Sequence, residues 1–249
     1  MEKKMETKKS LDYYDYYNNK DYALKRFKKL SNSNYRKFYA HFYNRVSVKK
    51  EMKVLDVGCG VGYFTNLVEL KGAKGFGIDI SKECIKLAKE NFKGEFLEGD
   101  ITKLPYENNF FDVIHCDEVI EHLSLNEARL MVNEMQRVLK KGGRIYVKTP
   151  NKEATGYRWL LQKFKGQQKI KKNDTHIFEY TKRELYNMFN KFGINYIKQE
   201  TYIPNKGVLG VFLGSFFSFP ILRKWFGIKL FMEAKKINEL DDVEKILNT

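Results

Sequence analysis

The sequence predicts an α/β protein in which a mostly parallel, doubly wound sheet carries helices on both faces. From residue 53 onward, short apolar runs rich in β-branched residues alternate with longer segments whose apolar residues recur at helical spacing. This alternation is typical of βα units, whose strands pair in parallel through right-handed crossovers. A chain of 249 residues is long enough for one such domain with a sizeable core.

The expected elements can be placed in order along the chain. Before the first strand, apolar and aromatic residues at helix-like spacing predict two short amphipathic helices within residues 1–50. Strands are expected at 53–57, 74–79, 95–99, 110–116, 144–149, 194–203 and 228–234, and helices at 62–71, 82–92, 119–140 and 182–192. Ser81 is a suitable N-cap for the helix that follows it, and Gly142 with Gly143 is expected to end the helix at 119–140.

The composition favours an anionic partner and argues against a disulfide-rich protein and a membrane-spanning protein. The net charge of +15 favours an anionic partner (nucleic acid, a membrane surface or an acidic substrate), although a lysine-rich chain from an AT-rich genome would look the same whatever it binds. The cysteines, Cys59, Cys84 and Cys116, have no metal-type spacing and fit a reduced cytosol rather than a disulfide scaffold. Neither a signal peptide nor an apolar run of about 18 residues is evident, so a soluble or at most peripheral protein is expected.

A glycine loop follows the first expected strand, in the sequence V-L-D-V-G-C-G-V-G at 54–62. Glycines at 58, 60 and 62 would let the backbone pass close to a ligand where a Cβ would collide. A second strand ends about 20 residues later on a single acid, Asp79, which is placed to accept two hydrogen bonds from a ribose diol. Together these features predict a site for a nucleoside cofactor.

The variant of the loop indicates which cofactor is expected. The sequence G-C-G-V-G differs from the G-x-G-x-x-G of dinucleotide binders, and Asp56 stands just before it. An acid there would repel a pyrophosphate and attract the α-ammonium of S-adenosylmethionine (SAM). The stretch resembles the first motif of the seven-strand SAM-dependent methyltransferases; an ordinary tight βα turn is the alternative.

The resemblance implies a Rossmann-like SAM-methyltransferase sheet of seven strands, mostly parallel, with an antiparallel final strand at the far side. In this family the N-terminal segment forms a lid over the cofactor and substrate pocket; packing on the sheet edge is the alternative. The expected division is an N-terminal helical cap at 1–50, a SAM-methyltransferase domain at 51–236 with insertions at 152–172 and 204–226, and a C-terminal tail at 237–249.

The family pattern places the cofactor contacts at or just after the carboxyl ends of the first four strands. Asp100 is expected to accept a hydrogen bond from the adenine amine, while the backbone N–H of Ile101 faces a ring nitrogen; a loop aspartate that caps a turn is the alternative. The predicted cofactor-binding residues are Asp56, Gly58, Cys59, Gly60, Asp79, Ile80, Asp100, Ile101 and Cys116.

The segment D-E-V-I-E-H-L at 117–123 lies just past the carboxyl end of the fourth strand, where ligands bind in open α/β sheets. If a helix begins there, Glu118, Glu121 and His122 share one face. Two carboxylates and an imidazole can hold a divalent cation such as Mg²⁺ or Zn²⁺. His176 follows the first insertion, where the chain could return over the same pocket.

These segments resemble two metal-using branches of the methyltransferases. The ubiquinone-biosynthesis O-methyltransferases carry E-x-x-E-H and a later T-H, and the small-RNA 3′-terminal 2′-O-methyltransferases carry E-V-I-E-H and D-H-x-F-E-W-T. This chain has E-V-I-E-H at 118–122 and T-H-I-F-E-Y-T at 175–181. The resemblance implies a metal site made of Glu118, Glu121, His122 and His176.

His122 and Glu118 are the predicted catalytic residues. In many SAM methyltransferases without a metal, the glutamate braces the cofactor loop and the histidine packs or acts alone. A neutral imidazole near pH 7 can take the proton of an acceptor hydroxyl, so His122 could serve as a general base. The metal-binding and base roles of His122 exclude each other, because a nitrogen bound to a metal cannot accept a proton.

The function expected from these features is SAM-dependent O-methylation of a small-molecule or lipid-linked acceptor by a cytoplasmic enzyme. The basic, Trp-bearing insertion at 152–172 and the apolar segment at 204–226 favour this acceptor and predict peripheral contact with an anionic membrane at its inner face. A cap helix over the sheet is the alternative for 204–226. Terminal 2′-O-methylation of RNA and a non-catalytic, SAM-binding partner subunit are the rival functions.

Overall fold

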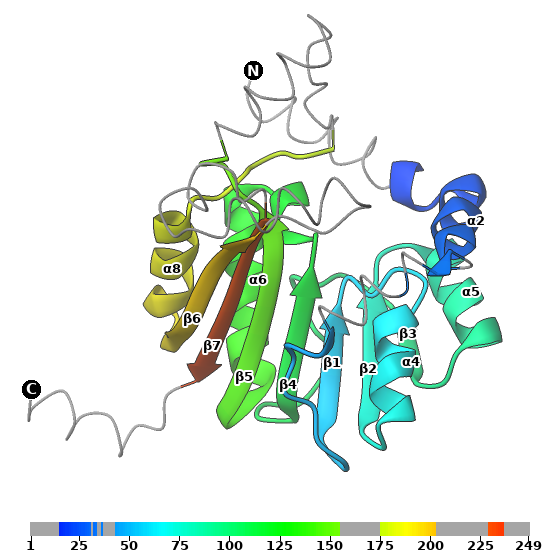
Figure 1. The fold of residues 1–249 in the computed structure, drawn as a ribbon, viewed down its shortest axis with the longest axis horizontal. Coiled ribbons are helices and arrows are strands. Elements are labelled where there is room, and N and C mark those ends of the chain that lie inside the picture. The colour runs from blue at the N-terminus through cyan, green and yellow to red at the C-terminus, as the bar shows by residue number, and fades with distance from the viewer. Residues whose placement is uncertain are drawn as a thin grey trace, which may run out of the picture.

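The computed structural model describes residues 15–30, 32–33, 36, 43–154, 175–202 and 229–236, and it contains a seven-stranded sheet in the order β3-β2-β1-β4-β5-β7-β6 (Figure 1). The strands are β1 (Lys53–Val57), β2 (Lys74–Asp79), β3 (Glu95–Glu98), β4 (Phe111–Asp117), β5 (Leu139–Pro150), β6 (Ile194–Tyr202) and β7 (Lys229–Lys236). Every described strand pairing is parallel except those of β7, which is antiparallel to both neighbours. The predicted fold, a mostly parallel seven-strand sheet with an antiparallel final strand, is confirmed.

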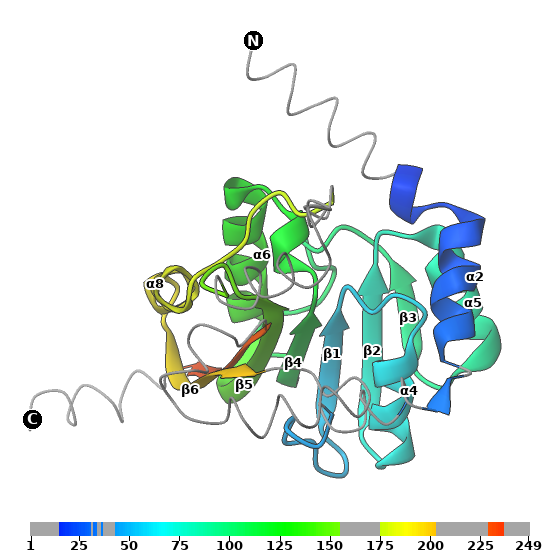
Figure 2. The ribbon, with the colours of Figure 1, turned by 45° about the horizontal axis from the view of Figure 1, so that its top comes forward.

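Helices cover both faces of this sheet (Figure 2). They are α2 (Lys20–Lys29), α4 (Tyr63–Leu70), α5 (Lys82–Asn91), α6 (Leu125–Val138) and α8 (Lys182–Lys191). On one face α6 and α8 bury their apolar residues against β1, β4, β5 and β7, which forms the larger core. On the other face Phe64 and Val68 of α4 pack with Tyr43 and Val46 of the segment before β1. α5 lies along β2 and β3, and α2 packs on α5.

The final strand is antiparallel as predicted, but it does not lie at the far side of the sheet. β7 is inserted between β5 and β6, so β6 forms the edge. The reason lies in the composition of β7, because its consecutive apolar residues are buried on both faces of the sheet. A strand of this kind needs neighbours on both sides, since a long apolar edge strand would invite aggregation. Its buried apolar residues are Leu230, Phe231, Met232 and Ala234.

The helix expected at 119–140 is two separate elements. A 3₁₀ turn, η1, spans Ile120–His122, and α6 begins only after Ser124. Ser124 forms a capping box: its hydroxyl accepts from the Glu127 N–H at 3.3 Å, and the Glu127 carboxylate accepts from the Ser124 N–H at 2.8 Å. A serine there favours a helix start over a helix interior, because its side chain satisfies one of the first unpaired N–H groups.

Gly142 and Gly143 do not end this helix, contrary to the prediction. α6 ends before them, and they lie within β5, which starts at Leu139. Gly142 has a φ of 75°, and the pairing of β5 with β4 shifts register between Phe111 and Val113. The glycines therefore accommodate an irregular start of the strand.

The remaining elements agree closely with the sequence prediction. Ser81 caps α5 as expected, since its hydroxyl accepts from the Cys84 N–H at 3.2 Å. Of the predicted cap, α2 is described; most of the expected second helix, residues 155–172 of the first insertion, the 204–226 insertion and the tail at 237–249 lie outside the described residues. Within the described part of the chain, no helix is long and apolar enough to cross a membrane.

Candidate active site

A pocket lies at the carboxyl ends of β1 and β4, the upper edge of the sheet in Figure 1, and α2 borders it. Ligand sites of open α/β sheets lie at this position. The glycine loop forms one wall, and residues of α2 and of the start of α4 form others. The pocket is lined by Arg26, Leu30, Asp56, Gly58, Cys59, Val61, Tyr63, Phe64, His115 and Asp117.

The glycine loop connects β1 to α4 and folds back onto β2. The N–H groups of Gly58 and Cys59 donate to the Ile78 carbonyl at 2.8 and 3.0 Å. Gly58 has a φ of 72°, and a Cβ there would come within 2.3 Å of Val119 Cγ2. This glycine is therefore required by the packing of the loop against the chain that follows β4.

Asp79, at the end of β2, holds the middle of the glycine loop. Its Oδ2 accepts from the Gly60 N–H at 2.8 Å and its Oδ1 from the Ser81 N–H at 2.9 Å. Burial raises the pKa of this carboxyl, while the two N–H donors and the Arg26 guanidinium oppose the rise. A Cβ on Gly60 would meet only Arg26 Nη2, at 3.9 Å among the described atoms, so the space over this glycine is open to a ligand. Each carboxylate oxygen has a second lone pair, which suits the predicted ribose contact.

The two predicted cysteines differ in their surroundings. Cys59 is half-buried and lines the pocket, as does Asp56. Cys116 is fully buried in the core that β4 shares with α6, and burial raises the pKa of its thiol well above the ordinary value. Its side chain therefore does not reach the pocket, and a cofactor contact at this position would fall to the backbone.

The predicted adenine-binding pair lies in the turn after β3. Asp100 is exposed, and its Oδ1 accepts from both the backbone N–H and the hydroxyl of Thr102, each at 2.8 Å. Asp100 therefore caps this turn through Oδ1, as the alternative prediction stated, and these hydrogen bonds do not use its Oδ2. Ile101 is half-buried against the core, and Ile80, next to Asp79, is exposed.

Five pocket-lining residues lie outside the sequence motifs that predict a site: Arg26, Leu30, Tyr63, Phe64 and His115. Arg26 reaches the pocket only because α2 packs on α5. The sequence feature that could have indicated His115 as a site residue is its position as a polar residue within the apolar run that forms β4.

A second group of side chains gathers at η1 and the loop 175–180. One ligand atom each of Glu121, His122 and His176 lies within 4.8 Å of the others, close enough to share a metal ion. The two imidazole rings stand 5.1 Å apart, edge to face. Two backbone N–H groups of the loop donate to the Glu121 carbonyl, at 2.8 and 3.1 Å, and hold the loop over η1.

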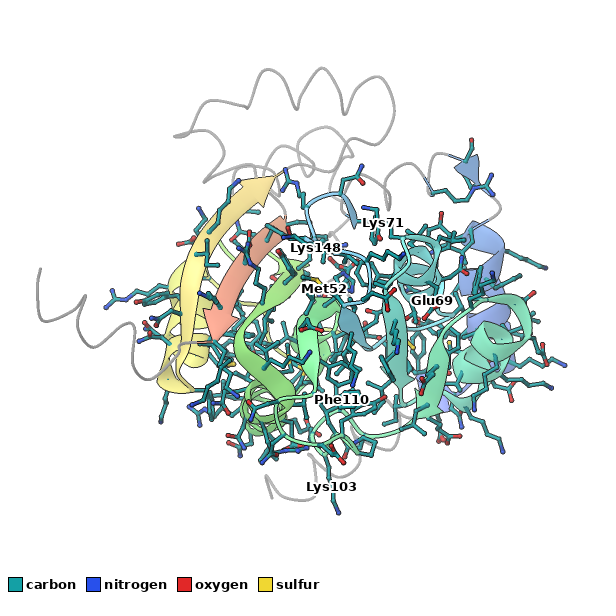
Figure 3. The ribbon with its side chains drawn as sticks, turned by 90° about the horizontal axis from the view of Figure 1, so that it is seen from below. Met52, Glu69, Lys71, Lys103, Phe110 and Lys148 are labelled. Atoms are coloured by element: carbon teal, nitrogen blue, oxygen red, sulfur yellow. The ribbon has the colours of Figure 1, made fainter. Side chains whose placement is uncertain are left out.

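Glu118 does not join this cluster. Its backbone has a φ of 58°, so the chain turns at this residue and no helix begins there. Its carboxylate pairs with Lys229 of β7 and lies 3.9 Å from the ammonium of Lys148, which Figure 3 labels on β5. The expectation that Glu118, Glu121 and His122 share one helical face is therefore wrong.

A family model described as Methyltransferase domain matches residues 48–193, which is more than half of the chain. The chain belongs to this methyltransferase family. The resemblance to the class I SAM-dependent methyltransferases is thereby confirmed.

Solved structures share the fold of this methyltransferase at low sequence identity. A chain of the complex between the Haloferax volcanii Trm112 methyltransferase activator and a methyltransferase superposes with a TM-score of 0.66 at 20% identity, over 88% of this chain and 97% of that one. A SAM dependent methyltransferase from Archaeoglobus fulgidus gives a TM-score of 0.65 at 19% identity, over 86% and 100%. These likenesses concern the fold alone.

Curated relatives are more similar in sequence, but each match covers only about half of the relative. The mitochondrial ubiquinone biosynthesis O-methyltransferase of Saccharomyces cerevisiae is 30% identical over 178 residues, which cover 64% of this chain and 55% of that protein. The ubiquinone biosynthesis O-methyltransferase of Pelagibacter ubique is 34% identical over 116 residues, 45% and 48% of the two chains. An uncharacterised protein of Methanocaldococcus jannaschii is 35% identical over 117 residues, 47% and 49%. The methyltransferase spans about half the length of the curated relatives it matches.

Burial keeps His122 neutral, although its hydrogen bond to the Thr175 carbonyl favours the charged form. Its Nδ1 lies 2.8 Å from the Thr175 carbonyl and 3.3 Å from the Tyr17 hydroxyl. Because a carbonyl oxygen only accepts, Nδ1 carries the proton and Nε2 carries the lone pair. Burial lowers the pKa of this imidazole to about 4, so the lone pair is present at neutral pH.

Glu121 is fully buried, and its Oε2 accepts from the Thr149 hydroxyl at 2.9 Å. Burial raises the pKa of this carboxyl to about 8, and the nearby negative charge of Glu118 adds to the rise. The protein without a metal therefore holds a protonated carboxyl beside a neutral imidazole at neutral pH. A cation bound there would compensate the charge that appears when the proton leaves.

The raised pKa of Glu121 makes the stability of the metal-free protein pH-dependent. The native carboxyl binds its proton more tightly than the unfolded one, so its stabilising contribution is complete below the ordinary value of 4.5 and is lost as the pH rises through about 8. The unfolding free energy should therefore fall over this range, by at most about 1.4 kcal/mol per pH unit. Glu121→Gln cannot ionise and should lose this part of the pH dependence, as measured by urea unfolding with a chelator present.

Glu90→Gln, on the exposed face of α5, is the matched control and should retain the wild-type pH dependence. Equal slopes for the wild type and Glu121→Gln would contradict the assignment of the raised pKa to Glu121.

Proposed function

We propose that this methyltransferase transfers a methyl group from SAM to an oxygen of a small-molecule or lipid-linked acceptor, with a divalent cation held by Glu121, His122 and His176. The observation that carries the proposal is the gathering of these three side chains at η1, which follows the pocket residue Asp117 at the carboxyl end of β4. Relatives that are named O-methyltransferases support the choice of an oxygen acceptor.

The residues around the pocket fit SAM. The open space over Gly60 admits a ligand close to the backbone, and Asp79 beside it offers lone pairs to a ribose diol. Asp56 lies in the pocket as a buried carboxylate that suits an α-ammonium. Asp100 and Ile101 are proposed to meet the adenine. When bound, SAM supplies an electrophilic methyl group on its sulfonium, so the chain's main task is to position the acceptor in line with it.

The cluster fits a divalent cation by its donor set and by one unsatisfied atom. Oε1 of Glu121 is buried and has no hydrogen-bond partner among the described residues. Two imidazoles and one carboxylate suit Zn²⁺, and Mg²⁺ is the alternative that a mainly oxygen shell of acceptor and water would favour. A cation there would lower the pKa of an acceptor hydroxyl bound to it.

His122 has a competing role that needs no metal. Its Nε2 lone pair is present at neutral pH and can accept the proton of an acceptor hydroxyl. The Thr175 carbonyl orients the ring in either role. Glu118, which is paired with Lys229, is proposed to brace the turn after β4 and not to bind the metal.

The net charge of +15 favours a second candidate, terminal 2′-O-methylation of RNA. Flotation with anionic vesicles and a gel shift with RNA at increasing salt would separate the two acceptor classes, because counterion release makes RNA binding fall steeply with salt. Two segments, 152–172 and 204–226, are proposed to touch a membrane, and only residues 152–154 of them belong to the described part of the chain. A cytoplasmic location and a non-catalytic partner role stay predictions from the sequence.

Asp79→Ala should abolish SAM binding measured by calorimetry, because it removes the ribose acceptor and releases the Gly60 N–H. Glu98→Ala is the matched control, since Glu98 pairs with Asp79 in the register of β2 and β3 and is exposed. It should bind SAM within about threefold of the wild type, a difference under 1 kcal/mol. Unchanged SAM affinity in a folded Asp79→Ala variant would refute the cofactor site.

Metal binding should be strongest where Glu121 is deprotonated. Calorimetric titration with Zn²⁺ or Mg²⁺ should show affinity rising from about pH 6 to about pH 8, because the carboxyl must release its proton to bind. Glu121→Gln and His176→Ala should each weaken binding at least about tenfold, whereas Glu118→Gln should retain it. If the purified protein contains no metal and a chelator leaves its activity intact, the metal is wrong and the base role of His122 remains.

The acceptor class can be found directly. The protein is incubated with radiolabelled SAM and cell extract, and the products are separated into lipid, RNA, protein and small molecules. Label is expected in the lipid or small-molecule fraction. Label confined to RNA would favour the second candidate, and label confined to protein would contradict both.

A further inference from the structure

The pocket contains a buried pair of ionisable side chains, Asp56 and His115, and the proposed function gives no role to His115. Asp56 of β1 and His115 of β4 are direct partners in the parallel register, and Asp56 Oδ1 lies 2.6 Å from His115 Nδ1. Their exposed fractions are 4% and 1%, and both line the pocket. Burying ionisable groups is costly unless each has a partner, so the pair is a specific feature of this site.

Neighbouring side chains hold both members in place. Phe64 of α4 stacks on the His115 imidazole, with ring centroids 3.7 Å apart and planes 13° apart. The Thr65 hydroxyl donates to Asp56 Oδ2 at 3.4 Å. The carboxylate is thus oriented by two donors, one from each side, before any ligand arrives.

The nearby acid of β4 has a different kind of partner. Asp117 lies two residues after His115, on the same face of the sheet, and pairs with Lys148 of β5. An ammonium does not ordinarily change its charge near neutral pH, whereas an imidazole does. Several charged and titratable groups of the described residues lie around the pair. They are Arg26 of α2, Cys59 of the glycine loop, Tyr63 of α4, Asp79 of β2, Cys116 and Asp117 of β4, and Tyr146 and Lys148 of β5.

The hydrogen bond determines what protonation of His115 would change. The Asp56 oxygen accepts, so Nδ1 donates to it whether the imidazole is neutral or charged. A neutral His115 leaves a full negative charge on Asp56 in the pocket. Protonation at Nε2 would place a positive charge beside that carboxylate, and opposite charges so close in a buried site largely compensate each other.

We propose that His115 is a positioning residue that orients Asp56 toward the α-ammonium of SAM and makes SAM binding depend on pH. The proposal rests on the proposed function, in which SAM occupies this pocket. With His115 neutral, Asp56 attracts the ammonium. With His115 protonated, the pair presents no net charge and the imidazolium repels the ammonium. SAM binding therefore displaces the His115 proton, and the affinity for SAM rises as the pH rises.

Calorimetry between about pH 5.5 and 7 tests this with S-adenosylhomocysteine, which has the α-ammonium but no sulfonium. In this window an α-amino group is ordinarily still charged. Glu121 and His122 titrate outside it, at about 8 and about 4. The wild-type affinity is expected to rise with pH, by at most about tenfold per pH unit. His115→Asn keeps an N–H donor near the Nδ1 position but cannot be protonated, so it should bind normally at about pH 7 and lose the pH dependence.

Three controls isolate the imidazole. Thr65→Val removes the other donor to Asp56 and should retain the pH dependence. His115→Phe keeps the stacking on Phe64 but not the donor, so it should bind more weakly at every pH. Adenosine, which has no ammonium, should bind the wild type with no pH dependence in this window.

An NMR titration of the histidine side chains tests the proposal on the wild-type protein, so it does not depend on whether a variant folds. The chain has four histidines, and one imidazole is expected to titrate at lower pH when S-adenosylhomocysteine is bound. If neither adenosine nor S-adenosylhomocysteine binds, the proposed function fails. If both bind and no imidazole responds, or His115→Asn keeps the wild-type pH dependence, the role of His115 is overturned and the proposed function stands.

Discussion

The parallel pairing of β1 with β4 is the constraint on which the rest of the site depends. It sets Asp56 opposite His115 and brings the glycine loop after β1 beside the turn that follows β4. Side chains alternate between faces, so a slip of one residue would turn Asp56 into the opposite core. Packing prevents such a slip, because Val54 and Leu55 enter cores on opposite faces of the sheet.

The turn after β4 then separates the acids of this segment into two electrostatic environments. Glu118, held in a left-handed backbone conformation, points its carboxylate to the lysines of β5 and β7. Glu121 is enclosed within η1, where burial favours its protonated form, and the neighbouring imidazole of His122 is kept neutral by the same cause. The same short segment thus contains an acid paired with lysines, Glu118, and two uncharged side chains, Glu121 and His122, that could bind a cation.

The N-terminal segment at 15–30, which includes α2, connects the pocket with the cluster of Glu121, His122 and His176. Ser81, near Asp79, donates to the Tyr17 carbonyl at 2.6 Å, and the Tyr17 hydroxyl lies 3.3 Å from His122 Nδ1. Arg26, farther along the same segment, faces Gly60. This segment therefore contacts both the pocket and the cluster of Glu121, His122 and His176, which a helix packed only on the sheet edge would not do.

The sequence by itself determined the fold class, the glycine loop and the acids at the strand ends, because hydrophobic period, glycine spacing and strand-terminal residues are local properties. It did not determine where β7 inserts in the sheet, because that depends on pairing with strands distant in the chain. It also did not determine that Ser124 begins a new helix within 119–140, because a serine can either cap a helix or lie inside one. The family resemblance also grouped His176 with His122, whose side chains meet in the structure. Only the tertiary structure brought Arg26 to the glycine loop and His115 to Asp56. Such meetings depend on sheet register and on loop hydrogen bonds between distant segments, and no spacing along the chain encodes them.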